Sequence, residues 1–394
     1  MKSVCLYFHI HQPYRIKKYR IYDVGHDAEY FNDRSECGLN NKAMMEKMAR
    51  TVYIPATSLI LRLLKKHPEM RVAYSFSGTA LDQMERYAPE ALDLFKRVVA
   101  TEQAEILAGT YYHSFSFFYS PAEFERQVVK HREAVQRIFN MRPRVFRNTE
   151  LSYRNDLGEW ADKAGFAGVV ADGWDPIIGW RSPNYVYRPH GVARTRLLMK
   201  NYRLSDDVAL RFSSPKSDEN PMTCEQCGKW IHENEGDIIN IVIPYDVLSG
   251  AYDDDSGISQ FLSNLPEAMH KNADISFRTP SEALSCHDPR EEIDVPRVVT
   301  GHASRNLSAW TGNPMQEAAL KAIYDMEDDV VLANDGRLLE DWRKMQTVDH
   351  FREMSTSGGR NAGCAYDSPY DAYIAYMNAL SDLQGRVARV RGKV

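Results

Sequence analysis

A single glutamate, Glu150, follows a short apolar run in a way that is typical of a catalytic carboxylate. Val145 and Phe146 predict a strand, and the polar residues Arg147 and Asn148 separate that strand from Glu150. In parallel α/β proteins, catalytic groups lie at the carboxyl ends of the strands. A neighbouring guanidinium and amide are suited to keep a carboxyl group ionised. From this local pattern alone, a glutamate that starts a helix after a strand is an equal alternative.

Two other strand ends carry imidazole groups. The apolar run 3–8 leads into His9, His11 and Gln12, and a later apolar run ends in a cluster of aromatic residues followed by His113. We expect His11 to contact a substrate, with a histidine buried in the core as the alternative. No further residues lie near His9 and His11 at the spacing of metal ligands, so no metal is predicted from this pattern.

The elements that must position these residues alternate along the first half of the chain. Strands are expected over 3–8, 71–77 and 104–108, in the apolar run before Glu150, and over 168–172. Helices are expected over 42–67, 80–100, 121–140 and 155–164. This alternation predicts a parallel α/β sheet or barrel with its site at the carboxyl ends of the strands. Later strands are expected over 237–244 and 296–300, and helices over 316–346 and 370–386, before a loose basic tail.

Composition narrows the class of partner. The chain has 394 residues, 43% of them apolar, with a net charge of −5, which argues against nucleic acid and anionic membranes as partners. No run approaches the ~18 apolar residues of a membrane span, and the first residues do not form a signal peptide. The six cysteines are scattered, and Cys224 and Cys227 have no second pair, so neither disulfides nor a zinc site is expected. We therefore expect a soluble cytoplasmic protein, and the oligomeric state is open.

Taken together, these motifs resemble glycoside hydrolase family 57, and within it the α-amylase branch. The resemblance runs from Cys5 to about Leu383, in five stretches that follow the order of the family. The stretches are His11-Gln12-Pro13, residues 105–114, residues 146–151, Tyr245 with its neighbours, and residues 305–313.

The resemblance implies an incomplete seven-stranded (β/α) barrel over 1–300, with a helical C-terminal region over 301–394 packed on it. It implies retaining action on α-1,4-glucans or maltooligosaccharides without a metal or other cofactor. Glu150 matches the nucleophile of the family. Substrate contacts are expected from His11, Gln12, His113, Asp207, Tyr245 and Trp310.

The second catalytic carboxylate is where this sequence departs from the family. A retaining glycosidase needs two carboxyl groups ~5 Å apart. An ungapped alignment places Pro244 at the family's acid/base Asp, Tyr245 at the Tyr after it, and Asp246 at the following Glu. Proline can neither donate nor accept a proton. The fifth stretch is altered as well, at 300–302 and at Asn306, where the family has further acids.

Three functions are compatible with this departure. The one we favour is an α-amylase-like protein that keeps the glucan site and has weakened or no turnover, because loss of a general acid/base costs about 10²–10⁴ in rate. The second is an active retaining hydrolase or glucanotransferase that uses Asp246 as the substitute acid/base, since i and i+2 of a strand share a face. The third is metal-dependent deacetylase-like chemistry with His9, His11, His113 and Asp172 as ligands.

Overall fold

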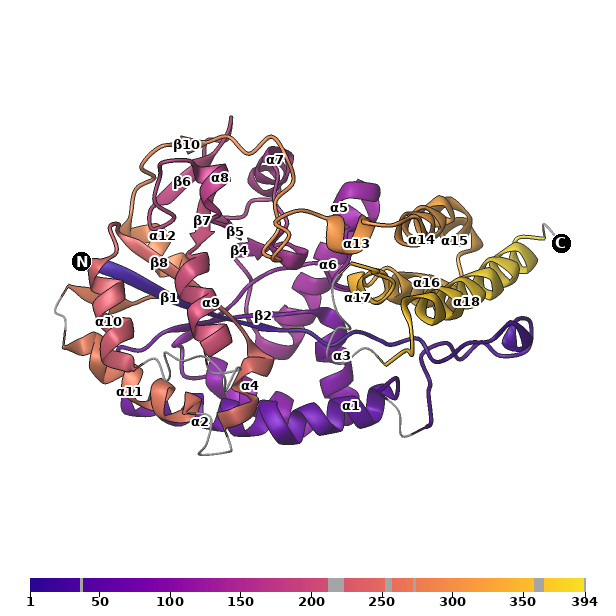
Figure 1. Ribbon diagram of the computed structural model, residues 1–394, viewed down its shortest axis with the longest axis horizontal. Helices are drawn as coiled ribbons and strands as arrows, with labels where there is room; N and C mark the ends of the chain where they lie inside the picture. Colours follow the sequence, from indigo (N-terminus) through magenta and orange to yellow (C-terminus); the bar gives the residue numbers. More distant parts are fainter. Residues whose placement is uncertain (36–37, 212–222, 252–256, 272–273, 358–364, 393–394) are drawn as a thin grey trace.

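Seven parallel strands form the inner wall of the fold, and helices cover it on the outside (Figure 1). The computed structural model describes residues 1–35, 38–211, 223–251, 257–271, 274–357 and 365–392. In ring order the strands are β1 (Lys2–Ile10), β2 (Val72–Phe76), β3 (Ala104–Ile106), β4 (Val145–Arg147), β5 (Gly168–Asp172), β7 (Arg196–Lys200) and β8 (Ile238–Pro244).

The ring closes between β8 and β1, and two of its junctions, β3 with β4 and β7 with β8, each rest on a single residue pair. β1 pairs with β8 from Ser3 opposite Ile238 up to His9 opposite Pro244. In the described residues, the β3 and β4 segments meet through one isolated bridge, Ala108 to Phe146. The predicted fold class, an incomplete seven-stranded (β/α) barrel, is therefore confirmed.

Three short strands extend the barrel sheet. β6 (Val186–Pro189) pairs antiparallel with β7, and β10 (Glu292–Ile293) pairs with β6. β9 (Ile275–Phe277) pairs in parallel with the start of β1.

Capping side chains start several of the helices around the barrel. Ser120, for example, accepts a hydrogen bond from the Glu123 N–H at the start of α6, and Asn140 ends that helix in a left-handed conformation. The helices are α1 (Asn41–Met48), α2 (Ile54–Lys66), α3 (Gly78–Tyr87), α4 (Pro89–Val99), α5 (Ser116–Tyr119), α6 (Pro121–Phe139), α7 (Asn155–Lys163), α8 (Asp175–Ile178), α9 (Tyr202–Arg211), α10 (Cys224–Glu233), α11 (Ile258–His270) and α12 (Pro280–Cys286). Shorter helical turns are η1 (Ile21–Asp23), η2 (Ala49–Tyr53), η3 (Thr149–Leu151) and η4 (Tyr245–Ala251).

The C-terminal region is helical, as expected, and has a hydrophobic core of its own. It comprises α13 (Ser308–Thr311), α14 (Pro314–Asp325), α15 (Glu327–Ala333), α16 (Gly336–Met345), α17 (Val348–Glu353) and α18 (Pro369–Val390). This core also includes Ile16, Tyr19, Tyr30 and Phe115, so the long N-terminal loop is packed against the C-terminal helices. A domain boundary at residue 300 stays a prediction.

Three sequence-based expectations are corrected here. Residues 296–300 form a single antiparallel bridge to Tyr153 and are not assigned as a strand. The helix expected over 316–346 is three helices, and one of the breaks is at Asn334, whose backbone is left-handed. The final helix continues to Val390, so most of the tail expected to be loose is helical.

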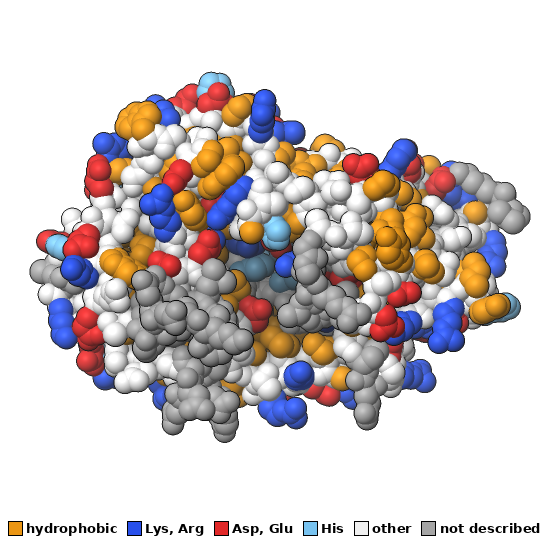
Figure 2. Space-filling model, viewed as in Figure 1, with side chains coloured by type: hydrophobic (Ala, Val, Ile, Leu, Met, Phe, Trp, Pro, Cys, Tyr) orange, Lys and Arg blue, Asp and Glu red, His pale blue; other side chains and the backbone are white. Residues whose placement is uncertain are grey.

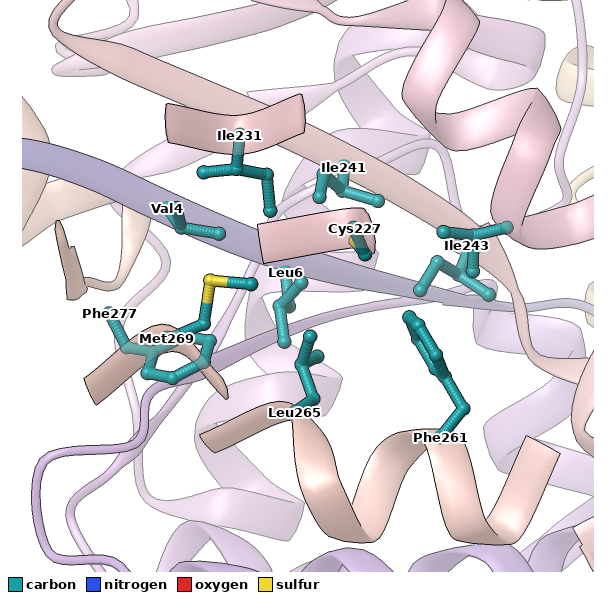
Figure 3. A pocket seen from close by; sticks show the side chains of 11 residues that line it. Val4, Leu6, Cys227, Ile231, Ile241, Ile243, Phe261, Leu265, Met269 and Phe277 are labelled. Carbon is teal, nitrogen blue, oxygen red and sulfur yellow. The ribbon is translucent and has the colours of Figure 1, made fainter. Parts of the chain in front are cut away.

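The Cys224 and Cys227 pair lies in the core. Cys224 donates to the Phe261 carbonyl over 2.8 Å, and Cys227 lines an apolar cavity of about 10 Å³ enclosed by α10, α11 and the sheet (Figure 3). This cavity has room for about one water molecule and is lined by apolar side chains, so it is a packing void. Within the described part of the chain, the helices are too short or too polar to cross a membrane.

Candidate functional site

Glu150 lies in η3, directly after β4, on a strained segment of backbone. Its φ is +54° and that of Leu151 is +53°, in the left-handed region that side chains other than glycine rarely adopt. The Gly301 N–H donates to the Glu150 carbonyl over 2.7 Å and holds the turn from the opposite side. Strain of this kind costs about 1–3 kcal/mol per residue and is concentrated at functional sites.

The Glu150 carboxylate accepts a hydrogen bond from His113. Nε2 of His113 lies 3.2 Å from Oε1 of Glu150, and 27% of the Glu150 side chain is exposed. Burial lowers the pKa of His113 to about 4, so its ring is neutral at pH 7 and donates the Nε2 proton. Burial alone would raise the pKa of Glu150, but the His113 hydrogen bond and the nearby Arg147 outweigh it and lower that pKa. Glu150 is therefore an ionised, accessible carboxylate.

Arg147 is the buried positive charge behind this carboxylate. Burial lowers its pKa to about 10, so the guanidinium is still charged at pH 7. Burial, and then the charge of Arg147, hold the pKa of His9 well below its usual range. Neutral His9 uses Nδ1 to donate to the Ser75 carbonyl over 3.1 Å.

Three histidines form a stacked array: His9 at the end of β1, His11 directly after that strand, and His113 in the segment after β3. The ring centroid of His11 lies 4.0 Å from that of His113, and His9 lies 5.3 Å from His113. His11 contacts Ser77 Oγ through Nδ1 and Asp349 Oδ2 through Nε2, each at 2.8 Å. Figure 2 shows histidine side chains in a hollow in the middle of this face.

Asp349, from α17, is a site residue that sequence reasoning missed. Burial would raise its pKa, but the charge of His11 and the hydrogen bond from it hold the pKa well below its usual range. Asp349 is 338 residues from His11 along the chain, and no local sequence pattern predicts the contact. The C-terminal helical region therefore supplies a carboxylate to the site.

The donor groups of this array are not arranged around a metal. Within the described residues, no group of three or more His, Cys, Asp or Glu side chains is placed to hold an ion. Both ring nitrogens of His11 already have protein partners, and Asp172 is paired with Arg305. The metal-dependent alternative therefore has no support from this geometry.

The end of β8 carries no carboxyl group toward Glu150. Pro244 is exposed and lies opposite His9 in the sheet register. Asp246 is exposed in η4. The pKa of Tyr53 is raised mainly by burial, and the charge of Asp246 raises it further. No hydrogen bond or ion pair joins Asp246 to Glu150, both of which the structure describes.

Gln12 is buried beside the same tyrosine. Its Nε2 donates to the Tyr53 hydroxyl over 3.2 Å, and its Oε1 accepts from Arg15 over 3.0 Å. Gln12 and Tyr53 are thus hydrogen-bonded to each other, and Asp246 lies within electrostatic range of Tyr53.

Tyr245 is part of the core, which corrects the expectation of a sugar contact. Its side chain is 1% exposed and its hydroxyl lies 2.8 Å from the Thr57 hydroxyl. Its ring packs against Phe8, Tyr53 and Tyr74. The end of β8 turns this residue away from the cleft, so in this conformation it touches no sugar.

Trp310 is also covered, so its predicted stacking on sugar is not retained. It is 0% exposed and packs edge-on against Phe115 and His302, with ring centroids 5.1 and 5.2 Å away. His302 is half-buried above it, and its Nδ1 accepts from the Ser304 N–H over 3.2 Å. His302, not Trp310, is the ring of this stretch that has access to the site.

The two adjacent acids of α9 have different surroundings. Asp206 contacts Lys200 Nζ at 3.0 Å and Arg305 Nη2 at 3.5 Å, and Arg305 also binds Asp172. Asp207 contributes instead to the raised pKa of Cys227, which is mainly due to burial. Successive helix residues are about 100° apart, so only one of two neighbours faces a given site. Asp206 therefore faces Lys200 and Arg305, and the substrate contact expected from Asp207 stays a prediction.

Comparisons with known proteins identify the family of the chain. The family model for glycosyl hydrolase family 57 matches residues 5–296. The chain is 32% identical to the "Putative alpha-amylase" of Methanocaldococcus jannaschii, covering 98% of this chain and 85% of that protein. Two solved structures have the same fold: a branching enzyme from Thermococcus kodakaraensis (TM-score 0.70, 12% identity, 98% of this chain and 91% of that one) and a 4-alpha-glucanotransferase from Thermococcus litoralis (TM-score 0.62, 15% identity, 89% and 56%). The chain therefore belongs to glycosyl hydrolase family 57.

Proposed function

We propose that this protein binds α-1,4-glucans at the site around Glu150 and uses Glu150 as a glycosyl-accepting nucleophile. Cleavage of ordinary glucans is weak or absent, because Pro244 stands where the family resemblance places the acid/base. The observation that supports this most directly is the ionised Glu150 carboxylate, held by His113 on a strained turn at the end of β4.

The chemistry follows from what the site holds. Attack of Glu150 on the anomeric carbon breaks the glycosidic bond, and the leaving sugar oxygen must gain a proton. A leaving group that is already stable as an anion, such as fluoride, needs no proton. His11, Gln12 and His113 are the side chains of the predicted set that this proposal keeps as sugar contacts. Oligomeric state and location play no part in it.

The test uses α-maltosyl fluoride and maltoheptaose side by side. We expect fluoride release from the first and little or no cleavage of the second. Glu150→Gln should reduce fluoride release by about 10⁴-fold or more, as removal of a nucleophile does. Equal fluoride release by the parent protein and by Glu150→Gln would overturn the proposal.

A second function has one observation in its favour. Asp246 is exposed and lies two residues after Pro244, the position where the family resemblance places the acid/base. If it serves as the acid/base, the protein is an active hydrolase or glucanotransferase. Maltoheptaose would then be cleaved at a rate comparable to fluoride release, and Asp246→Asn would lower that cleavage by about 10²–10⁴-fold.

A further inference from the structure

The segment 300–305 is packed directly on the turn that carries Glu150. The Gly301 N–H donates to the Glu150 carbonyl over 2.7 Å. A Cβ atom at Gly301 would lie 3.0 Å from Leu151 Cδ1 and 3.4 Å from the Glu150 carbonyl oxygen. The two segments therefore approach as closely as a residue without a side chain allows. His302 is the next residue of the segment, so it lies beside the Glu150 turn.

The same segment restricts the position of His302. The Thr300 N–H donates to the Arg305 carbonyl over 3.3 Å, and the Arg305 N–H donates to the His302 carbonyl over 2.8 Å. The guanidinium of Arg305 is itself bound by Asp172. The His302 ring packs edge-on against the buried Trp310, with 5.2 Å between the ring centroids. Contacts of the backbone and of the ring therefore both limit where the imidazole can point.

Ser304 fixes which nitrogen of His302 is unpaired. The Ser304 N–H donates to Nδ1 over 3.2 Å, and the Ser304 hydroxyl oxygen lies 3.0 Å from the same nitrogen. Among the residues that the structure describes, none forms a hydrogen bond or ion pair with Nε2 of this half-buried ring. A neutral imidazole that accepts at Nδ1 carries its proton on Nε2. The ring therefore offers one unpaired N–H donor.

The surroundings of His302 keep the ring neutral. Burial lowers the pKa of His302, the charges of Arg352 and Arg305 lower it further, and the charge of Glu150 opposes them. An unperturbed histidine has a pKa of about 6.5, so this ring is uncharged at pH 7. The effect of the Glu150 charge also places the ring within electrostatic range of that carboxylate. His302 is thus a neutral hydrogen-bond donor next to the nucleophile.

We infer that His302 donates a hydrogen bond from Nε2 to a hydroxyl oxygen of the sugar unit that reacts with Glu150, an inference that rests on the glucan site of the proposed function. Sugar hydroxyl oxygens are neutral acceptors, so this contact orients the sugar without adding a charge beside the nucleophile. Trp310 is then a positioning residue, because it supports the imidazole and is itself covered.

The test compares two variants that keep different parts of the hydrogen bonding of His302. His302→Asn keeps an acceptor near the position of Nδ1 and removes the Nε2 donor, whereas His302→Gln keeps an N–H donor near the position of Nε2. We expect His302→Asn to lower kcat/KM for fluoride release from α-maltosyl fluoride by about 3–10-fold, the effect of one hydrogen bond to a neutral group. His302→Gln should stay within about 2-fold of the parent.

A set of α-glucosyl fluorides that each lack one hydroxyl group identifies the acceptor on the sugar. For the analogue that lacks the partner hydroxyl, the parent and His302→Asn should have the same kcat/KM, because the hydrogen bond is absent in both. For the other analogues the difference of about 3–10-fold should remain. A difference of the same size for every analogue would overturn the inference.

Binding of maltoheptaose, measured by calorimetry, separates this inference from the proposed function. Binding needs no turnover, so it tests His302 even if the parent releases no fluoride, a result that would overturn the role of Glu150 as the nucleophile. We expect His302→Asn to weaken binding by about 3–10-fold and His302→Gln to leave it unchanged. Equal binding by His302→Asn and the parent would overturn the inference. A larger loss in His302→Gln than in His302→Asn would do the same, because the contact with Ser304 would then be what matters.

Discussion

The ends of β4 and β8 face the same site, yet they are built in opposite ways. After β4 the backbone enters a left-handed turn that keeps the Glu150 side chain in the cleft. After β8 the chain continues into η4, where Tyr245 fills the core and Pro244 is exposed without a functional group. The backbone after β4 is strained and keeps a carboxylate accessible, whereas the chain after β8 buries an aromatic side chain in the core.

This difference concerns how far the surroundings of Glu150 depend on the end of β8. The surroundings of Glu150, which are Arg147, His113 and the Gly301 contact, come from elements other than β8. A substitution at the end of β8 leaves them intact. The environment of Glu150 is therefore independent of the residue at the end of β8.

The largest effect is expected from Tyr245→Ala, at the packed end of β8. Removing a buried aromatic ring from a packed cluster costs about 3–5 kcal/mol of unfolding free energy. Urea unfolding measures this loss. Tyr245→Phe, which keeps the ring and loses the contact of its hydroxyl with the Thr57 hydroxyl, should cost about 0.5–1.5 kcal/mol. Weaker maltoheptaose binding in Tyr245→Phe at unchanged stability would show that Tyr245 is a sugar contact after all.

The next prediction restores the missing group by Pro244→Asp. A carboxyl group at this position lies opposite His9, at the carboxyl end of the barrel. We expect maltoheptaose cleavage relative to fluoride release to rise by about 10²-fold, the lower end of what a general acid contributes. Pro244→Asn, of the same size but without an acid, should leave the ratio unchanged. A similar rise in both variants would mean that the removal of proline matters more than the acid.

The two strand ends also show what sequence can and cannot predict. β5 was expected over 168–172 and has those bounds, because an apolar run buried on both faces is a strong signal. The ring of strands and the place of Glu150 followed from such runs and from the family motifs. The direction of the Tyr245 side chain did not, because it depends on how β8 ends.

Contacts between distant segments are the second gap. Asp349 reaches His11 across 338 residues, and Asp206 reaches Arg305 across 99 residues. The first contact needs α17 to pack on the barrel, and the second needs the rotation of α9 to be known. Neither contact can be obtained from spacing within a motif.

The smallest effect is expected from removing the hydrogen bond that His113 donates to Glu150. His113→Asn keeps a residue that tolerates the left-handed backbone of this position, where φ is +50°, but shortens the side chain. Without the His113 donor, burial should raise the pKa of Glu150, because only Arg147 still opposes it. Fluoride release requires the carboxylate, so it is lost as the pH falls through the pKa of Glu150.

The acid limb of the rate against pH should therefore move to higher pH in His113→Asn, while the rate at pH 7 falls less than about 10-fold. Fluoride release between pH 3 and 8 measures both. An acid limb at the same pH in the variant and the parent would mean that Arg147 alone keeps Glu150 ionised. The ionised state of Glu150 would then depend on the buried guanidinium of Arg147 and not on the histidine array. The charge of that guanidinium would be what distinguishes the end of β4 from the end of β8.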